Sequence, residues 1–149
     1  MRIALAALAG HAGQEVGRSG WHRITQQQVQ AFADATLDHQ WIHLDEQRAA
    51  AGPFGGTIAH GYLTLSLTPA LLAEAVQLDG VAATVNYGID RLRFPAPVPV
   101  GSQVRAVVEL ARAEEIAGGV QAVWKVTFEI EGGAKPACVA EIVFRYVAG

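Results

Sequence analysis

Hydrophobic positions in the first half of the chain recur at helical spacing. In residues 25–36, Thr25 stands where an N-cap residue is expected and Gln28 follows three positions later, as in a capping box. A second helix start comes at Asp45, and Gly52 stops that helix in turn. The pattern therefore predicts two short helices joined by a loop.

The following apolar segment, YLTLSLTPALLAEAVQ at residues 62–77, is hydrophobic on nearly every side of a helix. A Gly- and Pro-rich loop at residues 53–61 precedes it. A helix that is apolar all round is buried. We therefore expect a long helix in the centre of the domain, kinked at Pro69, where one backbone hydrogen bond is lost.

From Val81 onward the period of the pattern changes to two, with many β-branched residues. This alternation predicts four strands, at residues 81–94, 102–115, 120–132 and 136–147. An early strand near residues 17–23 would complete a sheet of about five strands, antiparallel because the later connections are too short for crossovers. The expected fold class is α+β: an antiparallel sheet wrapped around the central helix in a single domain, residues 1–149.

Composition and charge exclude several function classes. The 11 Lys and Arg residues are scattered and the net charge is -3, so no basic stripe is present to follow a nucleic acid or an anionic membrane. No apolar stretch reaches the roughly 20 residues of a membrane span, and the short apolar N-terminus is interpreted as a packed segment rather than a secretory signal. The single Cys138 excludes a disulfide framework and is expected to be a buried thiol, which fits a cytoplasmic protein.

The segment DATLDHQWIH, residues 34–43, gathers titratable groups in the predicted loop. A carboxylate at Asp38 and an imidazole at His43 suit a single water molecule, since one group can take a proton while the other supplies one. The alternative is that both side chains only cap helix ends and satisfy backbone groups of the loop.

A second chemical feature is Gly61, at the start of the central helix. Its N–H is a free donor at the positive end of the helix, and a glycine lets a substrate carbonyl approach the backbone closely. Such a donor can stabilise an oxyanion. The alternative is that Gly55, Gly56 and Gly61 only form the turn into the helix.

A metal site is not expected here. His39, His43 and Asp45 are close in sequence, but they lie in a predicted loop and lack the Glu of the helical zinc motif.

Two stretches together resemble a known family: FADATLDHQWIHLDEQRAA at residues 32–50 and GPFGGTIAHGYLTLSL at residues 52–67. They are similar to the hydratase motif of the MaoC-like dehydratases, the single hot-dog (R)-specific enoyl-CoA hydratases, in the branch that includes NodN-like proteins. YGIDRLRFPAPVPVGSQV, residues 87–104, is similar to the family's strand-turn-strand, so the resemblance covers nearly the whole chain. It implies a hot-dog fold and a homodimer whose two sheets join edge to edge.

The resemblance also implies an activity. Asp38 and His43 would form the catalytic pair and the Gly61 amide would bind the thioester oxygen of a trans-2-enoyl-CoA. Water would add with syn geometry to give an (R)-3-hydroxyacyl-CoA, with dehydration as the reverse reaction, and no metal or redox cofactor is needed. The sequence leaves open which residue of the pair is the base; the working assignment is Asp38 as base and His43 as proton donor.

Other expected roles follow from the same resemblance. Gln40 and His60 would support the loop, and the acyl chain would contact Trp41, Leu63 and Leu67. Gln40 and Trp41 replace the more usual Asn and Pro, and Leu37 replaces a more usual Gly.

Two other functions remain open. A hot-dog thioesterase would need an acidic residue on the central helix, which here would be Glu74. A non-catalytic module that binds acyl-CoA or an acyl carrier is suggested by the departures at Leu37 and Gln40.

Overall fold

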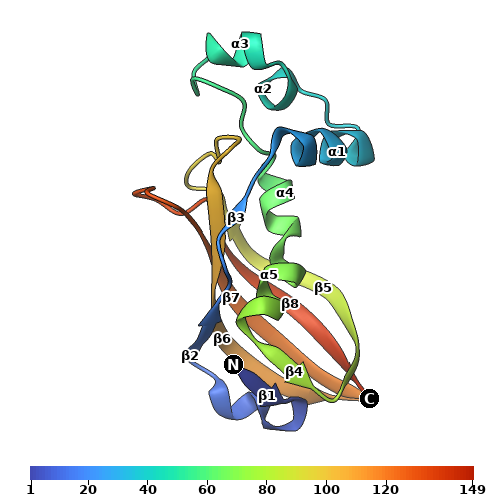
Figure 1. The fold of residues 1–149 in the computed structure, drawn as a ribbon. Helices are drawn as coiled ribbons and strands as arrows, with labels where there is room; N and C mark the ends of the chain where they lie inside the picture. The colour runs from blue at the N-terminus through green and yellow to red at the C-terminus, as the bar shows by residue number, and fades with distance from the viewer.

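The computed structural model describes all 149 residues. Helices α1 to α3 form a group at one end of the molecule, α4 and α5 run along the sheet, and both termini lie at the opposite end (Figure 1). None of the helices is both long enough and apolar enough to cross a membrane. In chain order the elements are β1 (Arg2–Ala4), η1 (Leu5–His11), β2 (Gln14–Arg18), β3 (His22–Arg23), α1 (Gln26–Thr36), α2 (Trp41–Leu44), α3 (Glu46–Ala50), α4 (Gly61–Ser66), α5 (Thr68–Ala75), β4 (Gln77–Asp79), β5 (Val81–Arg93), β6 (Gln103–Ile116), β7 (Gly119–Ile130) and β8 (Cys138–Ala148).

The main sheet has the strand order β2-β6-β7-β8-β5, with β3 also paired to β6. Every pairing in it is antiparallel, which confirms the predicted sheet and the α+β class. A second sheet was not predicted: β1 pairs with β4 in parallel and ties the N-terminal segment to the chain that follows α5. Ile3, Leu5 and Leu8 of that N-terminal segment are buried in the core.

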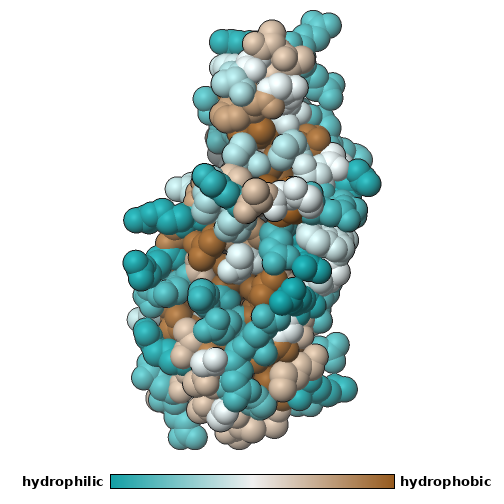
Figure 2. Space-filling view, turned by 90° about the vertical axis from the view of Figure 1, so that its left-hand side faces the viewer, coloured by the Kyte–Doolittle hydropathy of each residue, from teal (hydrophilic) through white to brown (hydrophobic).

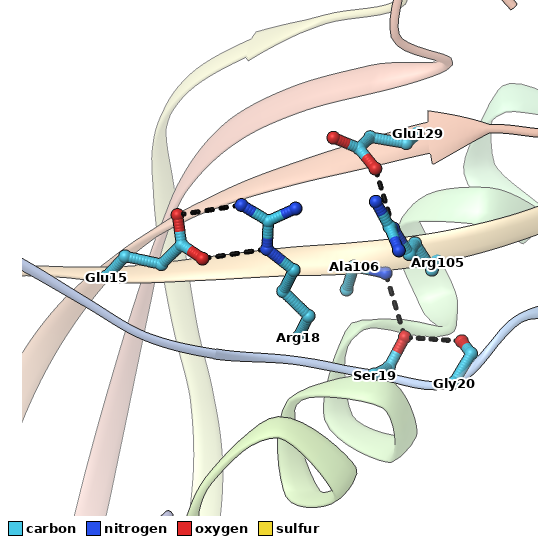
Figure 3. Close-up of polar contacts among 7 residues, drawn as sticks. All are labelled: Glu15, Arg18, Ser19, Gly20, Arg105, Ala106 and Glu129. Carbon is cyan, nitrogen blue, oxygen red and sulfur yellow. Dashed lines mark hydrogen bonds and ion pairs between the residues drawn. The ribbon is translucent and has the colours of Figure 1, made fainter.

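The early strand predicted near residues 17–23 is divided into β2 and β3. Between them Ser19 holds the chain against β6: its amide donates to the Ala106 carbonyl at 2.9 Å. Its hydroxyl accepts from the Ala106 amide, also at 2.9 Å (Figure 3). The same hydroxyl donates to the Gly20 carbonyl at 2.8 Å. The ion pair of Arg105 with Glu129, 2.7 Å between Nε and Oε2, lies beside this break on β6 and β7 (Figure 3).

The predicted central helix is two helices, α4 and α5, with Leu67 between them. Pro69 has no N–H with which to bond the Leu65 carbonyl, as the sequence predicted. The Thr68 hydroxyl donates to that carbonyl instead, at 2.6 Å. The interruption therefore leaves the Leu65 carbonyl with a donor.

Every second side chain of β7 points toward the face of the sheet that packs against the helices. Ala122, Trp124, Val126 and Phe128 are fully buried and belong to one core cluster with Leu71 of α5. Burial also raises the pKa of the Cys138 thiol to about 11, in agreement with the predicted inert cysteine.

The outer face of the sheet carries charges in alternating sign on neighbouring strands. Glu109 lies opposite Lys125, Lys125 opposite Glu141, and Glu141 opposite Arg91. Cross-strand pairs of opposite charge favour this register. The exposed arginine Arg91 thus continues a row of charges across the sheet.

Candidate active site

Helix α1 positions the first residue of the pair. Its N-cap is Thr25, whose hydroxyl oxygen accepts from the Gln28 amide at 3.1 Å, as predicted. Its C-cap is Leu37, with φ of 64°, the only non-glycine residue with positive φ. This left-handed residue turns the chain out of the helix, so Asp38 leaves the end of α1 in a new direction.

The loop around Asp38 is held mainly by backbone groups. The Gln40 amide donates to Asp38 Oδ1 at 3.3 Å, and the Gln40 carbonyl accepts from the His43 amide at 3.1 Å. The side-chain amide of Gln40 makes no hydrogen bond within the chain. The side-chain support expected of Gln40 is therefore not seen, and its backbone groups hold the loop instead. The expected open loop in fact contains the one-turn helix α2, which carries His43.

His43 is buried, with 6% of its surface exposed. Its Nδ1 lies 2.7 Å from the Ile58 carbonyl oxygen, which can only accept, so Nδ1 carries the hydrogen and Nε2 is left with a lone pair. Burial is the largest cause that holds the pKa of His43 below its ordinary value of 6.5, and the nearby His60 acts in the same direction. The Ile58 carbonyl and the Asp38 carboxylate oppose this shift in the pKa without reversing it.

His60 lies against both members of the pair. Its ring stacks on His43 with 3.8 Å between centroids and 23° between planes, and its Nε2 donates to the Asp38 carbonyl at 3.0 Å. His60 is the N-cap residue of α4, so Gly61 is the first helical residue and its N–H has no intrahelical acceptor.

The three side chains converge on one cavity. A carboxylate oxygen of Asp38 and one ring nitrogen of each histidine all lie within 4.8 Å of one another. The cavity has a volume of about 580 Å³ and is lined by Phe32, Thr36, Asp38, His43, His60, Gly61, Tyr62 and Phe94. Of the site residues predicted from the sequence, the structure thus brings Asp38, His43, His60 and Gly61 together at one cavity.

These groups do not form a good metal site, although they are close. An imidazole lone pair lies in the plane of its ring, and the planes of His43 and His60 are stacked 23° from parallel. The two lone pairs therefore do not meet at one point about 2 Å from each nitrogen. His39 lies elsewhere, with its Nε2 2.9 Å from Asp34 Oδ1.

The three residues expected to contact an acyl chain do not line this cavity. Trp41 stacks on the Arg48 guanidinium, 4.2 Å from the ring centroid. Leu63 is buried in the core cluster and Leu67 packs against it. Glu74, which the thioesterase alternative requires, pairs with His22 at 2.8 Å and accepts from the Gly20 amide, outside the cavity.

Several residues of the site were not found from the sequence. Phe32, Tyr62 and Phe94 supply the apolar wall of the cavity. Gln26 donates from Nε2 to the His43 carbonyl and accepts from the Thr57 hydroxyl, both at 2.7 Å. A glutamine in the first turn of a helix gives no sequence signal for such a bridge, because both partners are distant along the chain.

Comparison with known proteins agrees with this geometry. A family model described as MaoC like domain matches residues 8–129. The 3-hydroxyacyl-thioester dehydratase Z of Mycobacterium tuberculosis is 57% identical over 145 residues, covering 97% of this chain and 96% of that protein. The nodulation protein N of Rhizobium leguminosarum is 43% identical over 141 residues, covering 93% and 88%. The solved (R)-hydratase from A. caviae, described as involved in PHA biosynthesis, has a TM-score of 0.72 at 31% identity, covering 89% of this chain and 96% of that one.

A mostly antiparallel sheet wrapped around a central helix is the hot-dog fold, which the solved (R)-hydratase shares. The chain belongs to the MaoC-like dehydratase family, and the relatives named as dehydratases or hydratases are hydro-lyases. The resemblance drawn from residues 32–67, including the relation to NodN, is confirmed.

Proposed function

We propose that the protein is an (R)-specific enoyl-CoA hydratase and 3-hydroxyacyl-thioester dehydratase. The observation that carries the proposal is the placement of the Asp38–His43 pair and the Gly61 amide on one cavity. The names of two relatives, a 3-hydroxyacyl-thioester dehydratase and an (R)-specific enoyl-CoA hydratase, support the same reaction in its two directions.

The Asp38–His43 pair has the spacing to hold one water molecule. A water that donates at about 2.8 Å to two acceptors places them about 4.4 Å apart. A carboxylate oxygen of Asp38 and a ring nitrogen of His43 lie within 4.8 Å of one another. The carboxylate and the free Nε2 of neutral His43 are the acceptors that would hold the water. The water oxygen is then free to face the β-carbon of the substrate.

The Gly61 amide would polarise the thioester carbonyl of the substrate. A thioester oxygen bound to this N–H gains negative charge as water attacks, and a fixed backbone donor stabilises that charge. A β-carbon at Gly61 would meet the Phe94 ring at 3.2–3.3 Å, so the glycine and the aromatic ring are fitted to one another. Phe94 and Tyr62 then form the apolar wall against which the acyl group lies.

The hydrogen bond of His43 supports the opposite of the working assignment, with His43 as base. With Nδ1–H held by Ile58, the free Nε2 takes a proton from water while the water oxygen forms its bond to the β-carbon. The resulting imidazolium lies beside the Asp38 carboxylate and returns that proton to the α-carbon on the same face. Syn addition follows because one side chain serves both steps, and Asp38 orients the water and stabilises the cation.

A homodimer is the assembly that the sheet edge favours. β5 is paired only to β8, and its exposed side chains include Val85, Tyr87 and Ile89. A groove of about 370 Å³, lined by this strand, β8 and the turn between α4 and α5, adds apolar surface. The face seen in Figure 2, on the opposite side of the molecule from β5 in Figure 1, is instead mostly polar. A second copy joined at β5 would pair the free edge, and its mass in solution tests this.

The test of the proposed reaction is the loss of absorbance of the conjugated enoyl thioester of crotonyl-CoA. We expect turnover by the wild type and its near-complete loss in Asp38→Asn. The control is Asp34→Asn, which removes an exposed carboxylate paired with His39 outside the cavity. Tight binding of a saturated acyl-CoA without any turnover of crotonyl-CoA or a longer enoyl-CoA would instead identify a binding module.

A further inference from the structure

The His60 side chain contacts both members of the Asp38–His43 pair. It donates to the Asp38 carbonyl and presents its ring face to His43. On another side it meets Phe32, with 4.9 Å between ring centroids. Its own peptide bond continues into Gly61, so a shift of His60 would move all three groups assigned to the reaction.

The hydrogen bond of His60 fixes its tautomer. The Asp38 carbonyl can only accept, so Nε2 of His60 carries the hydrogen. Nδ1 therefore has a lone pair, and this nitrogen is buried without a partner in the chain. A buried polar atom left unpaired is costly, and such a cost is tolerated mainly where the group has a role.

We propose that His60 is a positioning residue with two separable roles, in which its Nε2–H holds the Asp38 loop and its ring face fixes the orientation of the His43 ring. This inference rests on the proposed function. The Nε2–H acts on the backbone that carries the acid. The ring acts on the orientation of His43 and on its exclusion from water.

Two substitutions separate these roles. In His60→Gln the amide can still donate to the Asp38 carbonyl, but the stacked ring is lost. In His60→Phe the ring remains while the donor is lost. We expect each variant to lose about 10- to 100-fold in kcat with a smaller change in KM, because a misplacement of about 1 Å can cost on the order of 100-fold in rate.

The pH dependence distinguishes positioning from a general loss of structure. Asp38 and His60 are the titratable groups that face His43. Burial is the main cause of the lowered pKa of His43. We therefore expect its pKa to rise toward 6.5 in His60→Gln and to stay low in His60→Phe, since only the latter keeps the ring in place.

The titration is followed by NMR of the histidine ring carbons and nitrogens, which needs no turnover and remains informative if the proposed reaction fails. Equal losses of kcat in both variants with an unmoved His43 titration, or wild-type kcat in both, would overturn the proposal. Should either variant fail to fold by circular dichroism, the ring nitrogens of wild-type His60 decide. A hydrogen on Nδ1 instead of Nε2 would contradict the proposal, and the reverse would support it.

Discussion

Nδ1 of His43 donates to the carbonyl oxygen of Ile58 across 2.7 Å. Ile58 belongs to the segment that leads into α4, and its backbone is held in turn, since the Ile58 amide donates to the Ile42 carbonyl at 3.0 Å. Two chain segments thus fix one tautomer of one imidazole. The lone pair on Nε2 follows from backbone geometry and not from any neighbouring acid.

This tautomer predicts the pH dependence of the reaction. If neutral His43 is the base, kcat/KM is at its plateau at neutral pH and falls as pH decreases through the pKa of His43, which lies below 6.5. If His43 were instead the initial proton donor, the rate would fall as pH rises through the same pKa. The profile of kcat/KM between about pH 5 and pH 8 distinguishes the two signs. A rate that increases toward pH 5 would restore the assignment of Asp38 as base.

Leu37→Gly is expected to stabilise the protein. Leu37 has φ of 64° and a side chain that is 80% exposed, so glycine relieves backbone strain and removes almost no packing. A left-handed conformation costs a residue with a side chain about 1–2 kcal/mol, offset in part by the roughly 0.5–1 kcal/mol entropic cost of glycine. Urea denaturation should show a gain of about 0.5–1 kcal/mol in the free energy of unfolding.

The control for this substitution is Leu37→Ala, which keeps a β-carbon in the same backbone conformation and should leave stability nearly unchanged. A loss of stability in Leu37→Gly would contradict the left-handed geometry at this position. Activity should stay near that of the wild type in both variants, because Leu37 does not line the cavity.

Local chemistry was predictable from the sequence, and distant contacts were not. Thr25 and Asp45 cap their helices as expected, since a cap depends on residues three positions away. Phe94 reaches the cavity from beyond the end of β5, which no periodicity indicates. The positions of Leu63 and Leu67 in and against the core were unpredictable for a related reason: a helix that is apolar on every side does not show which side faces a cavity and which faces the core.

Gln26→Leu tests whether the Gln26 side chain holds α2 in place. The change leaves the His43 carbonyl and the Thr57 hydroxyl without their partners, and each such loss costs about 1–3 kcal/mol when the group is buried. We expect a lower urea midpoint and a kcat reduced by about 10-fold or more, because α2 carries His43 and a small displacement of a reacting group is costly in rate. Gln27→Leu, at an exposed neighbouring position, is the matched control. Equal effects of the two substitutions would exclude the proposed bridge.

The Gly61 amide can be removed without breaking α4. Proline is well accepted at the first position of a helix, where the N–H has no intrahelical partner, and the extended backbone of His60, with ψ of 136°, is compatible with a following proline. Gly61→Pro therefore deletes the proposed donor to the thioester oxygen while the helix start is retained.

Gly61→Ala is the control for the donor, because its β-carbon meets the same Phe94 ring while its N–H is kept. Both variants should lose activity by displacing Phe94, and the proline variant should lose about 10²- to 10³-fold more in kcat, the usual effect of removing one oxyanion donor. The comparison uses single-turnover rates with crotonyl-CoA, so that chemistry is separated from product release. Equal rates in the two variants would mean that the thioester oxygen is bound by another group, and the role of Gly61 would then be limited to accommodating Phe94.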